Sequence, residues 1–139
     1  MAERLTLELA TPARMVVTAE ADEVVVPGSE GSFGVLPGHA PFLTTLGIGE
    51  LIYRSGREER HVAVAGGFAE VRNDKVIVLA DAAETPEDID RARAEQARAR
   101  AEARLTAHAS VEEIDYARAT AALARALIRL QVAGRPTGL

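Results

Sequence analysis

The 139-residue sequence contains no cysteine and no tryptophan, and aromatic residues make up only 4% of it. Without cysteine the chain can form neither disulfides nor thiolate metal sites, which fits a reducing compartment. No apolar run approaches the roughly eighteen residues that a membrane-spanning helix needs, and no signal peptide opens the chain. We therefore expect a soluble protein without direct membrane insertion, which reaches a membrane only through a partner.

Positive charge is scarce in the first part of the chain. Residues 1–84 carry seven basic and thirteen acidic groups, so we expect no binding to nucleic acid or anionic lipid there. Residues 85–139 carry nine arginines and eight acids but no lysine. Arginine is preferred for bidentate contacts with carboxylates and phosphates, although high-GC coding bias explains the same composition.

Motifs for catalysis and for phosphate binding are absent as well. There is no Gly-x-x-x-x-Gly-Lys loop and no Gly-x-Ser-x-Gly turn. His39, His61 and His108 are scattered, and none has metal-ligand spacing with another. We therefore expect neither a catalytic site nor a metal site in this chain.

Short apolar and β-branched runs fill residues 1–84. Leu5, Leu7 and Leu9 alternate with polar or small residues, as in a half-buried strand, and Gly66-Gly67 predicts a bend or bulge. Turn residues separate the other runs: Pro27-Gly28, Ser55-Gly56-Arg57 and Asn73-Asp74. Many short strands at this spacing predict a β-sandwich or barrel. Four of the five aromatic residues are expected in its core: Phe33, Phe42, Tyr53 and Phe68.

From about residue 82 the pattern becomes helical. Thr85 as N-cap and Pro86 at the first helical position predict where a helix starts, and no glycine or proline follows until after Ala107. Residues 110–113 form a capping box for a second helix, which Gly134 should end. Two helices joined by so short a turn must be antiparallel if they pack together.

Alanine dominates the expected contact between these helices. The inner face of the first helix is predicted to hold Ile89, Leu105, Ala92, Ala99 and Ala103. The second helix is richer in large apolar residues: Ile114, Leu123, Leu127, Ile128 and Leu130. Because alanine buries little area, and burial contributes roughly 25 cal/mol per Å², the contact should be weak. Weak packing suits a switch, although a stable hairpin that never opens is the alternative.

Folding the hairpin back about residue 109 would gather arginines at its open end. Arg125 and Arg129 share a face of the second helix, Arg93 would lie across from Arg125, and Asp90 would lie near Arg129. The functional interpretation is an anion site, most simply for phosphates, with the carboxylate available for a base or ribose. The alternative is an Asp90–Arg129 surface ion pair beside two solvated arginines.

The most constrained stretch is residues 30–42, EGSFGVLPGHAPF, with three glycines and two prolines among large apolar residues. Such a loop is typical of a shaped recognition surface, although a tight corner between strands also explains it. The stretch from Gly28 to Pro41 resembles the signature loop of the epsilon subunit of bacterial F-type ATP synthase. Further matches are VAGGFAEV at 64–71, VIVLAD at 76–81 and the helical tail, so the resemblance runs from about residue 5 to about residue 132.

This resemblance implies a fold, partners and a location. The fold is an N-terminal antiparallel β-sandwich, residues 1–84, followed by a C-terminal antiparallel two-helix hairpin, residues 85–139. The sandwich would bind the gamma subunit, and a loop would face the c-ring through Glu30, Ser32, Gly38 and His39. Since some relatives carry an acid at the position of Ser32, no charge contact is implied there. The chain would be a non-catalytic rotor subunit, peripheral to the bacterial cell membrane on its cytoplasmic side.

The resemblance also implies regulation by the hairpin. Residues 89–94, IDRARA, match the motif Ile/Leu-Asp-x-x-Arg-Ala, with which epsilon subunits of some bacteria hold ATP in the folded hairpin. The implied ATP site comprises Glu84, Ile89, Asp90, Arg93, Ala94, Arg100, Arg125 and Arg129. A compact hairpin would permit ATP hydrolysis, and an extended one would reach the alpha/beta catalytic head and block rotation. ATP would be a regulatory ligand, and no cofactor is required.

Two other classes of function fit parts of the sequence. One is a free cytosolic nucleotide-sensing module, and the other is a β-sandwich ligand-binding protein whose helices only dimerise. Neither explains the detail of residues 28–41, which favours the rotor subunit.

Overall fold

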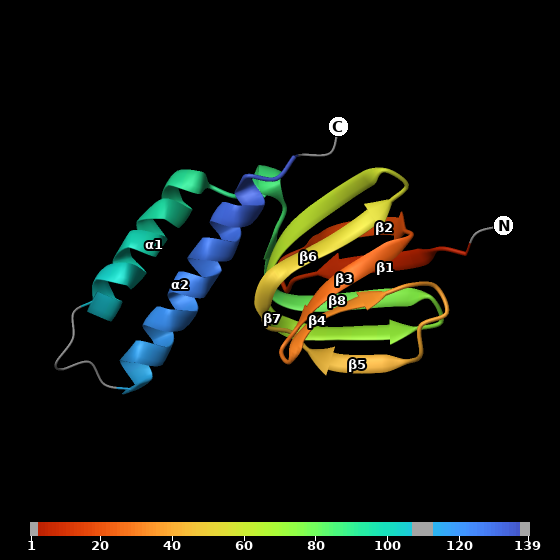
Figure 1. The fold of residues 1–139 in the computed structure, drawn as a ribbon, viewed down its shortest axis with the longest axis horizontal. Coiled ribbons are helices and arrows are strands. Elements are labelled where there is room, and N and C mark those ends of the chain that lie inside the picture. Colours follow the sequence, from red (N-terminus) through yellow and green to blue (C-terminus); the bar gives the residue numbers. More distant parts are fainter. Residues whose placement is uncertain (1–2, 107–112, 137–139) are drawn as a thin grey trace.

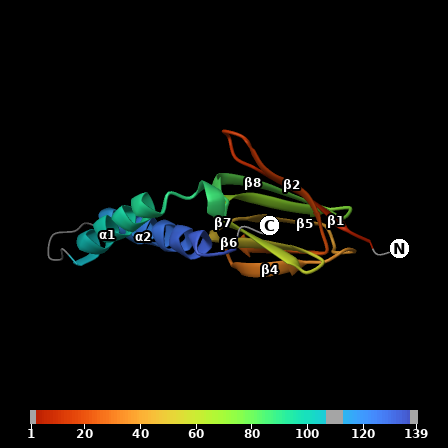
Figure 2. The same ribbon diagram turned by 90° about the horizontal axis from the view of Figure 1, so that it is seen from above.

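The structure, a computed structural model, describes residues 3–106 and 113–136. Strands gather at one end and two helices at the other, so the molecule is elongated (Figures 1 and 2). The elements are β1 (Leu5–Ala10), β2 (Met15–Ala21), β3 (Glu23–Gly28), β4 (Gly31–Val35), β5 (Phe42–Thr45), β6 (Ile48–Ser55), β7 (Glu58–Arg72), β8 (Lys75–Glu84), the 3-10 turn η1 (Pro86–Asp88), α1 (Arg91–Thr106) and α2 (Glu113–Ala133).

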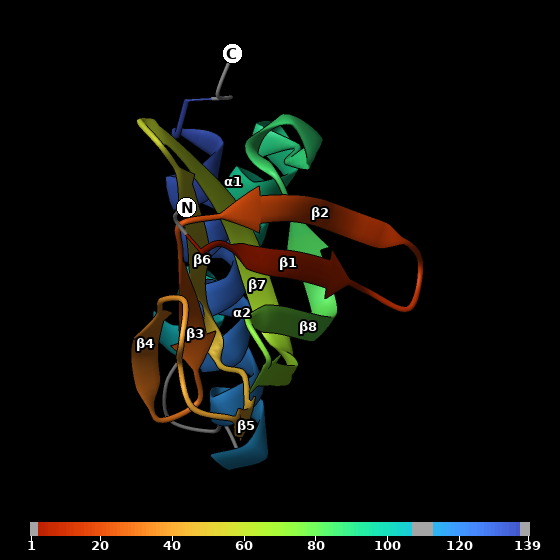
Figure 3. The same cartoon turned by 90° about the vertical axis from the view of Figure 1, so that its right-hand side faces the viewer.

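The strands form a sandwich that β7 holds together. Hydrogen bonding follows the order β2-β1-β8-β7-β6-β3-β4, and β5 pairs with the far part of β7. The first part of β7 pairs with β6 and its second part with β5, so this one strand belongs to both layers. Viewed from the sandwich end in Figure 3, β3 and β4 lie to one side of β7, and β8 lies to the other. All pairs are antiparallel except β1 with β8.

The bend in β7 lies at Gly66-Gly67, as the sequence predicts. Both residues have positive φ, at 70° and 113°, and the pairing of β7 with β8 is interrupted at Gly66 without a change of register. A Cβ atom on Gly67 would lie 2.0 Å from the carbonyl oxygen of Leu79, so only glycine fits. This bend lets a single strand cross between the layers.

The core of the sandwich is aliphatic. Leu5, Leu7 and Leu9 are fully buried, as their alternation predicts. The prediction of an aromatic core is wrong: Phe33 and Tyr53 are only partly buried, whereas Phe42 and Phe68 are exposed. Phe68 is exposed because side chains alternate between the two faces of β7, and its neighbour Ala69 faces inward and is buried.

The first helix begins later than the sequence predicts. Thr85 makes no side-chain capping bond, and Pro86–Asp88 forms a separate 3-10 turn. The start of α1 at Arg91 is instead set by Asp90, whose Oδ1 accepts a hydrogen bond from the Arg93 amide at 3.1 Å. Asp90 therefore acts as the N-cap, because its carboxylate reaches an amide that has no partner within the helix.

Alanine lines the contact between α1 and α2, but not at the predicted positions. Ala94 and Ala101 of α1 are buried, as are Ala119 and Ala126 of α2. The predicted alanines of α1 are exposed: Ala92, Ala99 and Ala103. The face of α1 that packs against α2 is the one that carries Leu105. Residues 101 and 94 lie four and eleven positions before Leu105, so they are on the same face.

Helix α2 lies between α1 and the sandwich (Figures 1 and 2). It ends at Ala133, immediately before Gly134, as predicted. Leu127 was expected to pack against the first helix, but it is exposed, because α2 contacts α1 and the sandwich through other faces. The predicted capping box, His108 and the side chain of Ile114 lie outside the described residues.

Candidate functional site

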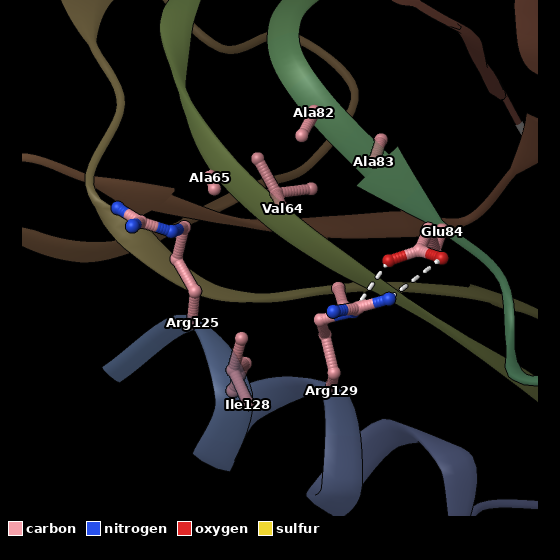
Figure 4. Close-up of a pocket in the computed structure, with 9 residues that line it drawn as sticks. Val64, Ala65, Ala82, Ala83, Glu84, Arg125, Ile128 and Arg129 are labelled. Carbon is pink, nitrogen blue, oxygen red and sulfur yellow. Dashed lines mark hydrogen bonds and ion pairs between the residues drawn. The ribbon is translucent and has the colours of Figure 1, made fainter. Parts of the chain in front are cut away.

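A pocket of about 140 Å³ lies where α2 packs against the sandwich. Figure 4 shows it between α2 and strands β7 and β8. Its lining residues are Ala63, Val64, Ala65, Ala82, Ala83, Glu84, Arg125, Ile128 and Arg129. The strands contribute mostly alanine here, whose small side chains leave the space open.

The polar edge of the pocket is an ion pair between the two parts of the chain. Arg129 Nε lies 2.7 Å from Glu84 Oε1, and Arg129 Nη2 donates a hydrogen bond to Glu84 Oε2 at 3.4 Å (Figure 4). The alternative considered from the sequence, an Asp90–Arg129 pair, is therefore wrong. Glu84 ends β8 opposite α2, whereas the Asp90 carboxylate is used to cap α1.

Arg125 provides a second positive charge at the pocket. Its side chain extends from α2 toward the sheet, as that of Arg129 does (Figure 4). Within the part of the chain that the structure describes, Arg125 makes no hydrogen bond or ion pair, whereas Arg129 is held by Glu84. The pocket thus combines one paired and one unpaired guanidinium, an arrangement that attracts anions.

The structure brings together three of the eight residues expected to bind ATP: Glu84, Arg125 and Arg129. The other five do not line the pocket: Ile89, Asp90, Arg93, Ala94 and Arg100. Ala94 is buried in the helix contact, and Arg93 and Arg100 have exposed side chains on α1.

A second polar cluster joins the end of α2 to the sandwich, and sequence reasoning missed it. Glu50 of β6 contacts both His61 of β7 and Arg135, which follows α2. Burial of the Glu50 carboxyl acts to raise its pKa, but hydrogen bonds and charges from Arg135 and His61 outweigh burial, so the pKa lies below its ordinary value. The only signal in the sequence was a single carboxylate inside an apolar strand.

The residues expected to face the c-ring lie around an open groove of about 510 Å³. It runs between the β3–β4 hairpin and β5, and its lining residues are Gly28, Ser29, Glu30, Gly31, Ser32, Phe33, Phe42, Leu43, Thr44 and Thr45. The Ser29 amide donates to the Thr45 carbonyl at 2.9 Å, which closes one end. Two of the four expected residues, Glu30 and Ser32, thus line the groove.

The other two residues lie in the adjoining loop. Gly38 has a φ of 87°, which favours glycine, and its amide donates to Asp74 Oδ1 at 2.7 Å. The ring of His39 lies 6.3 Å from that of Phe42, and its Nδ1 donates to the Ala40 carbonyl at 2.6 Å. The loop is therefore held by contacts from both of its sides.

The outer face of β5, β7 and β8 carries exposed apolar side chains. Phe68 pairs across the sheet with Thr45 and with Leu79, and Leu43 lies two positions before Thr45 on the same face of β5. Leu43, Phe68 and Leu79 are each more than half exposed. Contiguous apolar surface of this kind is typical of a protein interface.

Two classes of site find no support in residues 3–106 and 113–136. No group of three histidine, aspartate or glutamate side chains there could hold a metal ion. No helix within the same described ranges is long and apolar enough to cross a membrane.

Comparison with protein families gives two adjoining matches. The model described as ATP synthase, Delta/Epsilon chain, beta-sandwich domain matches residues 4–86. The model described as ATP synthase, Delta/Epsilon chain, long alpha-helix domain matches residues 87–134. The chain belongs to this family.

Relatives of known name refine the assignment to the epsilon chain. "ATP synthase epsilon chain 2" of Syntrophotalea carbinolica is 51% identical over 135 residues, which cover 97% of each chain. "ATP synthase epsilon chain" of Geobacter sp. strain M21 is 50% identical over 137 residues, 99% of each chain. The resemblance stated from the sequence is thereby confirmed, and the protein is an epsilon-type, non-catalytic subunit of ATP synthase.

Solved structures support the fold. A chain of the Euglena gracilis mitochondrial ATP synthase, solved as "OSCP/F1/c-ring in rotational state 1", superposes with a TM-score of 0.78 at 24% identity, over 95% of this chain and 82% of that one. A chain of the Tetrahymena thermophila mitochondrial enzyme, from a structure of "central stalk/cring", gives 0.60 at 13% identity, over 95% and 98%. At such identities the likeness concerns the fold alone.

Proposed function

We propose that this epsilon chain is a rotor component that connects the gamma subunit to the c-ring and regulates ATP hydrolysis through its hairpin. The outer apolar face around Phe68 and Leu79 is the surface for the gamma subunit, because exposed aromatic and aliphatic groups suit a permanent interface. The groove that Glu30 and Ser32 line, with the loop at Gly38 and His39, faces the polar ends of the c-ring. The subunit would be peripheral to the bacterial membrane, on its cytoplasmic side.

The regulatory part of the proposal is carried by the pocket between α2 and the sandwich. Glu84 comes from β8, whereas Arg125 and Arg129 come from α2, so these groups meet only while the hairpin is docked. A ligand that binds this arrangement stabilises the docked hairpin by its differential affinity for the two states. ATP phosphates are the natural ligand for the two guanidinium groups.

The size of the pocket limits how ATP can bind. About 140 Å³ is less than half of the roughly 300 Å³ at which ligand pockets begin. The docked pocket therefore has room for phosphate groups only, and the rest of the nucleotide would lie outside it and reach past α2 to α1. Arg93 and Arg100, which have no partner among the described residues, are the groups on α1 that we assign to it, with Asp90 selecting the base or ribose.

Removal of the hairpin tests the regulatory role directly. A chain ending after Pro86 keeps every strand, and we expect it to fold alone and to bind the gamma subunit, since the buried cluster of the sandwich contains only residues before 81. ATP synthase assembled with this chain should hydrolyse ATP faster than the enzyme with the full chain when ATP is low. Equal rates would overturn inhibition by the hairpin but leave the rotor assignment intact.

A second measurement separates the rotor subunit from a free nucleotide-sensing module. Native membranes should yield the chain together with the other ATP synthase subunits in an affinity purification. Recovery only from the soluble fraction would contradict the rotor role.

A further inference from the structure

Among the residues that the structure describes, the most deeply buried ion pair, Glu50–His61, lies where α2 ends against the sandwich. The side chains of Glu50 and His61 are each only 8% exposed, although both groups can carry charge. Glu50 lies on β6 and His61 pairs near it on β7, so both belong to the sandwich. Arg135, 85 positions after Glu50, comes from the residues that follow α2.

Both oxygens of the Glu50 carboxylate are used. Arg135 donates from Nη2 to Oε1 at 3.1 Å and from Nε to Oε2 at 3.2 Å, the bidentate geometry that guanidinium favours. His61 Nδ1 lies 3.1 Å from Oε1, and Gln131 Nε2 donates to Oε2 at 3.5 Å. One carboxylate of the sandwich thus holds two side chains from the end of the hairpin.

The position of this contact in the chain gives it mechanical importance. The hairpin leaves the sandwich through residues 85–90, where Arg14 forms an ion pair with Asp88 at 2.6 Å. It returns at Arg135, and Arg91 donates to the Ala133 carbonyl at 2.7 Å, which ties the two ends of the hairpin together. The first connection is covalent and permanent, whereas the second depends on Glu50.

The remaining contacts cannot easily replace it. The Glu84 carboxylate that holds Arg129 is 31% exposed, so water can solvate it when the pair breaks and the pair contributes little, whereas the Glu50 carboxylate is only 8% exposed although Arg135 itself is 40% exposed. Loss of Arg135 would in contrast leave the Glu50 charge buried with only His61 and the neutral amide of Gln131 beside it, which is strongly unfavourable. Helix α1 packs mainly on α2, so it adds little to docking on the sheet.

We propose that Glu50 and Arg135 form a latch that holds the helical hairpin against the β-sandwich. With the latch closed, the hairpin is attached at both ends and cannot rotate away. With the latch open, the Glu84–Arg129 pair and the packing of α2 on β6 and β7 are the contacts left besides the covalent connection, and residues 85–90 act as the hinge when these contacts part. The latch itself rests on the contacts of this chain alone, and its use in regulation rests on the proposed function.

Distance measurement on the isolated full-length chain tests the latch. Because the protein has no cysteine, Arg57→Cys in the β6–β7 turn and Arg104→Cys in the last turn of α1 can carry a pair of fluorescent labels. The two sites lie at opposite ends of the docked molecule (Figure 1), so the labelled parent should show one well-defined distance. Arg135→Gln and Glu50→Gln should each increase the population at distances other than that of the docked parent at least fivefold, and combining them should add little to either alone.

Two comparisons make the outcome decisive. Glu8→Gln removes a carboxylate that pairs with Lys75 inside the sandwich at 3.1 Å, and it should leave the distance unchanged. Arg135 lies outside the sandwich, so Arg135→Gln tests the latch without changing a residue of the strands. An unchanged distance in this variant overturns the latch. Since the assay contains neither ATP nor another subunit, such a failure is distinct from a failure of the proposed regulation.

Discussion

Two carboxylates of the sandwich, Glu50 and Glu84, each hold one arginine of the hairpin, but in different surroundings. Glu84 is about one third exposed and has Arg129 as its one side-chain partner within the described ranges, so an incoming phosphate can replace Glu84 as the partner of Arg129. Glu50 is nearly buried and accepts from three side chains, so it has no exchangeable position. The first contact is suited to sensing a ligand, and the second is suited to holding the hairpin in place.

The lowered pKa of Glu50 predicts how docking responds to acid. Because the docked state lowers the pKa from 4.5, docking gains stability that is fully present above pH 4.5 and is lost as the pH falls through the docked value. The charged groups that face Glu50 are Arg135 and His61, with Glu59 behind His61 at 3.9 Å. We expect the label pair described above to leave its docked distance below pH 4.5 in the parent chain.

The same titration of Glu50→Gln identifies the responsible group. Asp88 also has a lowered pKa, chiefly because Arg14 donates a hydrogen bond to it, so it titrates in a similar window. If Glu50 is responsible, the variant should be undocked already at neutral pH and show little further change in acid. A parent-like acid transition in the variant would assign the effect to Asp88 instead.

At the scale of elements, the sequence predicted strands, bends and helix ends correctly where a local pattern allows only one backbone geometry. Alternation placed Leu5, Leu7 and Leu9 in the core, and the pair Gly66-Gly67 marked the bend of β7. Gly134 marked the end of α2. In each case the constraint lies within a few residues of the chain, where sequence reasoning is strongest.

The predictions that were wrong depend on contacts between distant segments. The partner of Arg129 depends on where β8 ends relative to α2, and the role of Glu50 depends on a residue 85 positions away. The sequence could not predict which face of α1 contacts α2, because alanines occur on several faces and only the packing against α2 selects one of them. For the same reason the sequence predicted an anion site, but only three of the eight expected residues meet in the structure: Glu84, Arg125 and Arg129.

The corrected phase of α1 gives a prediction at the element scale. Ala94 is fully buried against α2, so Ala94→Leu should force the helices apart at a cost of about 1–3 kcal/mol. Ala92 is exposed on the same helix, and Ala92→Leu should change hairpin stability little. Amide hydrogen exchange in α1 measures both, with faster exchange expected only for Ala94→Leu. The opposite ranking would support the face first predicted from the sequence.

At the scale of the whole molecule, the sandwich is the fixed part and the hairpin is the part that can change. The core of the sandwich contains seventeen buried residues with aliphatic side chains, whereas the contact between the helices consists largely of alanine. Local opening is easiest where few apolar contacts must be broken, so the hairpin opens before the sandwich unfolds. A small binding energy can therefore decide the state of the hairpin, which is a requirement for regulation by a metabolite.

The effect of ATP on the isolated chain follows from this balance. ATP that binds only the docked hairpin, at a free concentration 100 times its Kd, should stabilise it by about 2.7 kcal/mol and slow opening-dependent amide exchange about 100-fold. Arg125→Ala should abolish this protection, because it removes the unpaired guanidinium of the pocket without breaking an existing contact. Arg118→Ala, one heptad earlier on the exposed surface of α2, is the matched control and should keep it. Exchange that does not respond to millimolar ATP in the parent chain would mean that the two arginines serve the structure alone, and regulation would then have to come from other subunits.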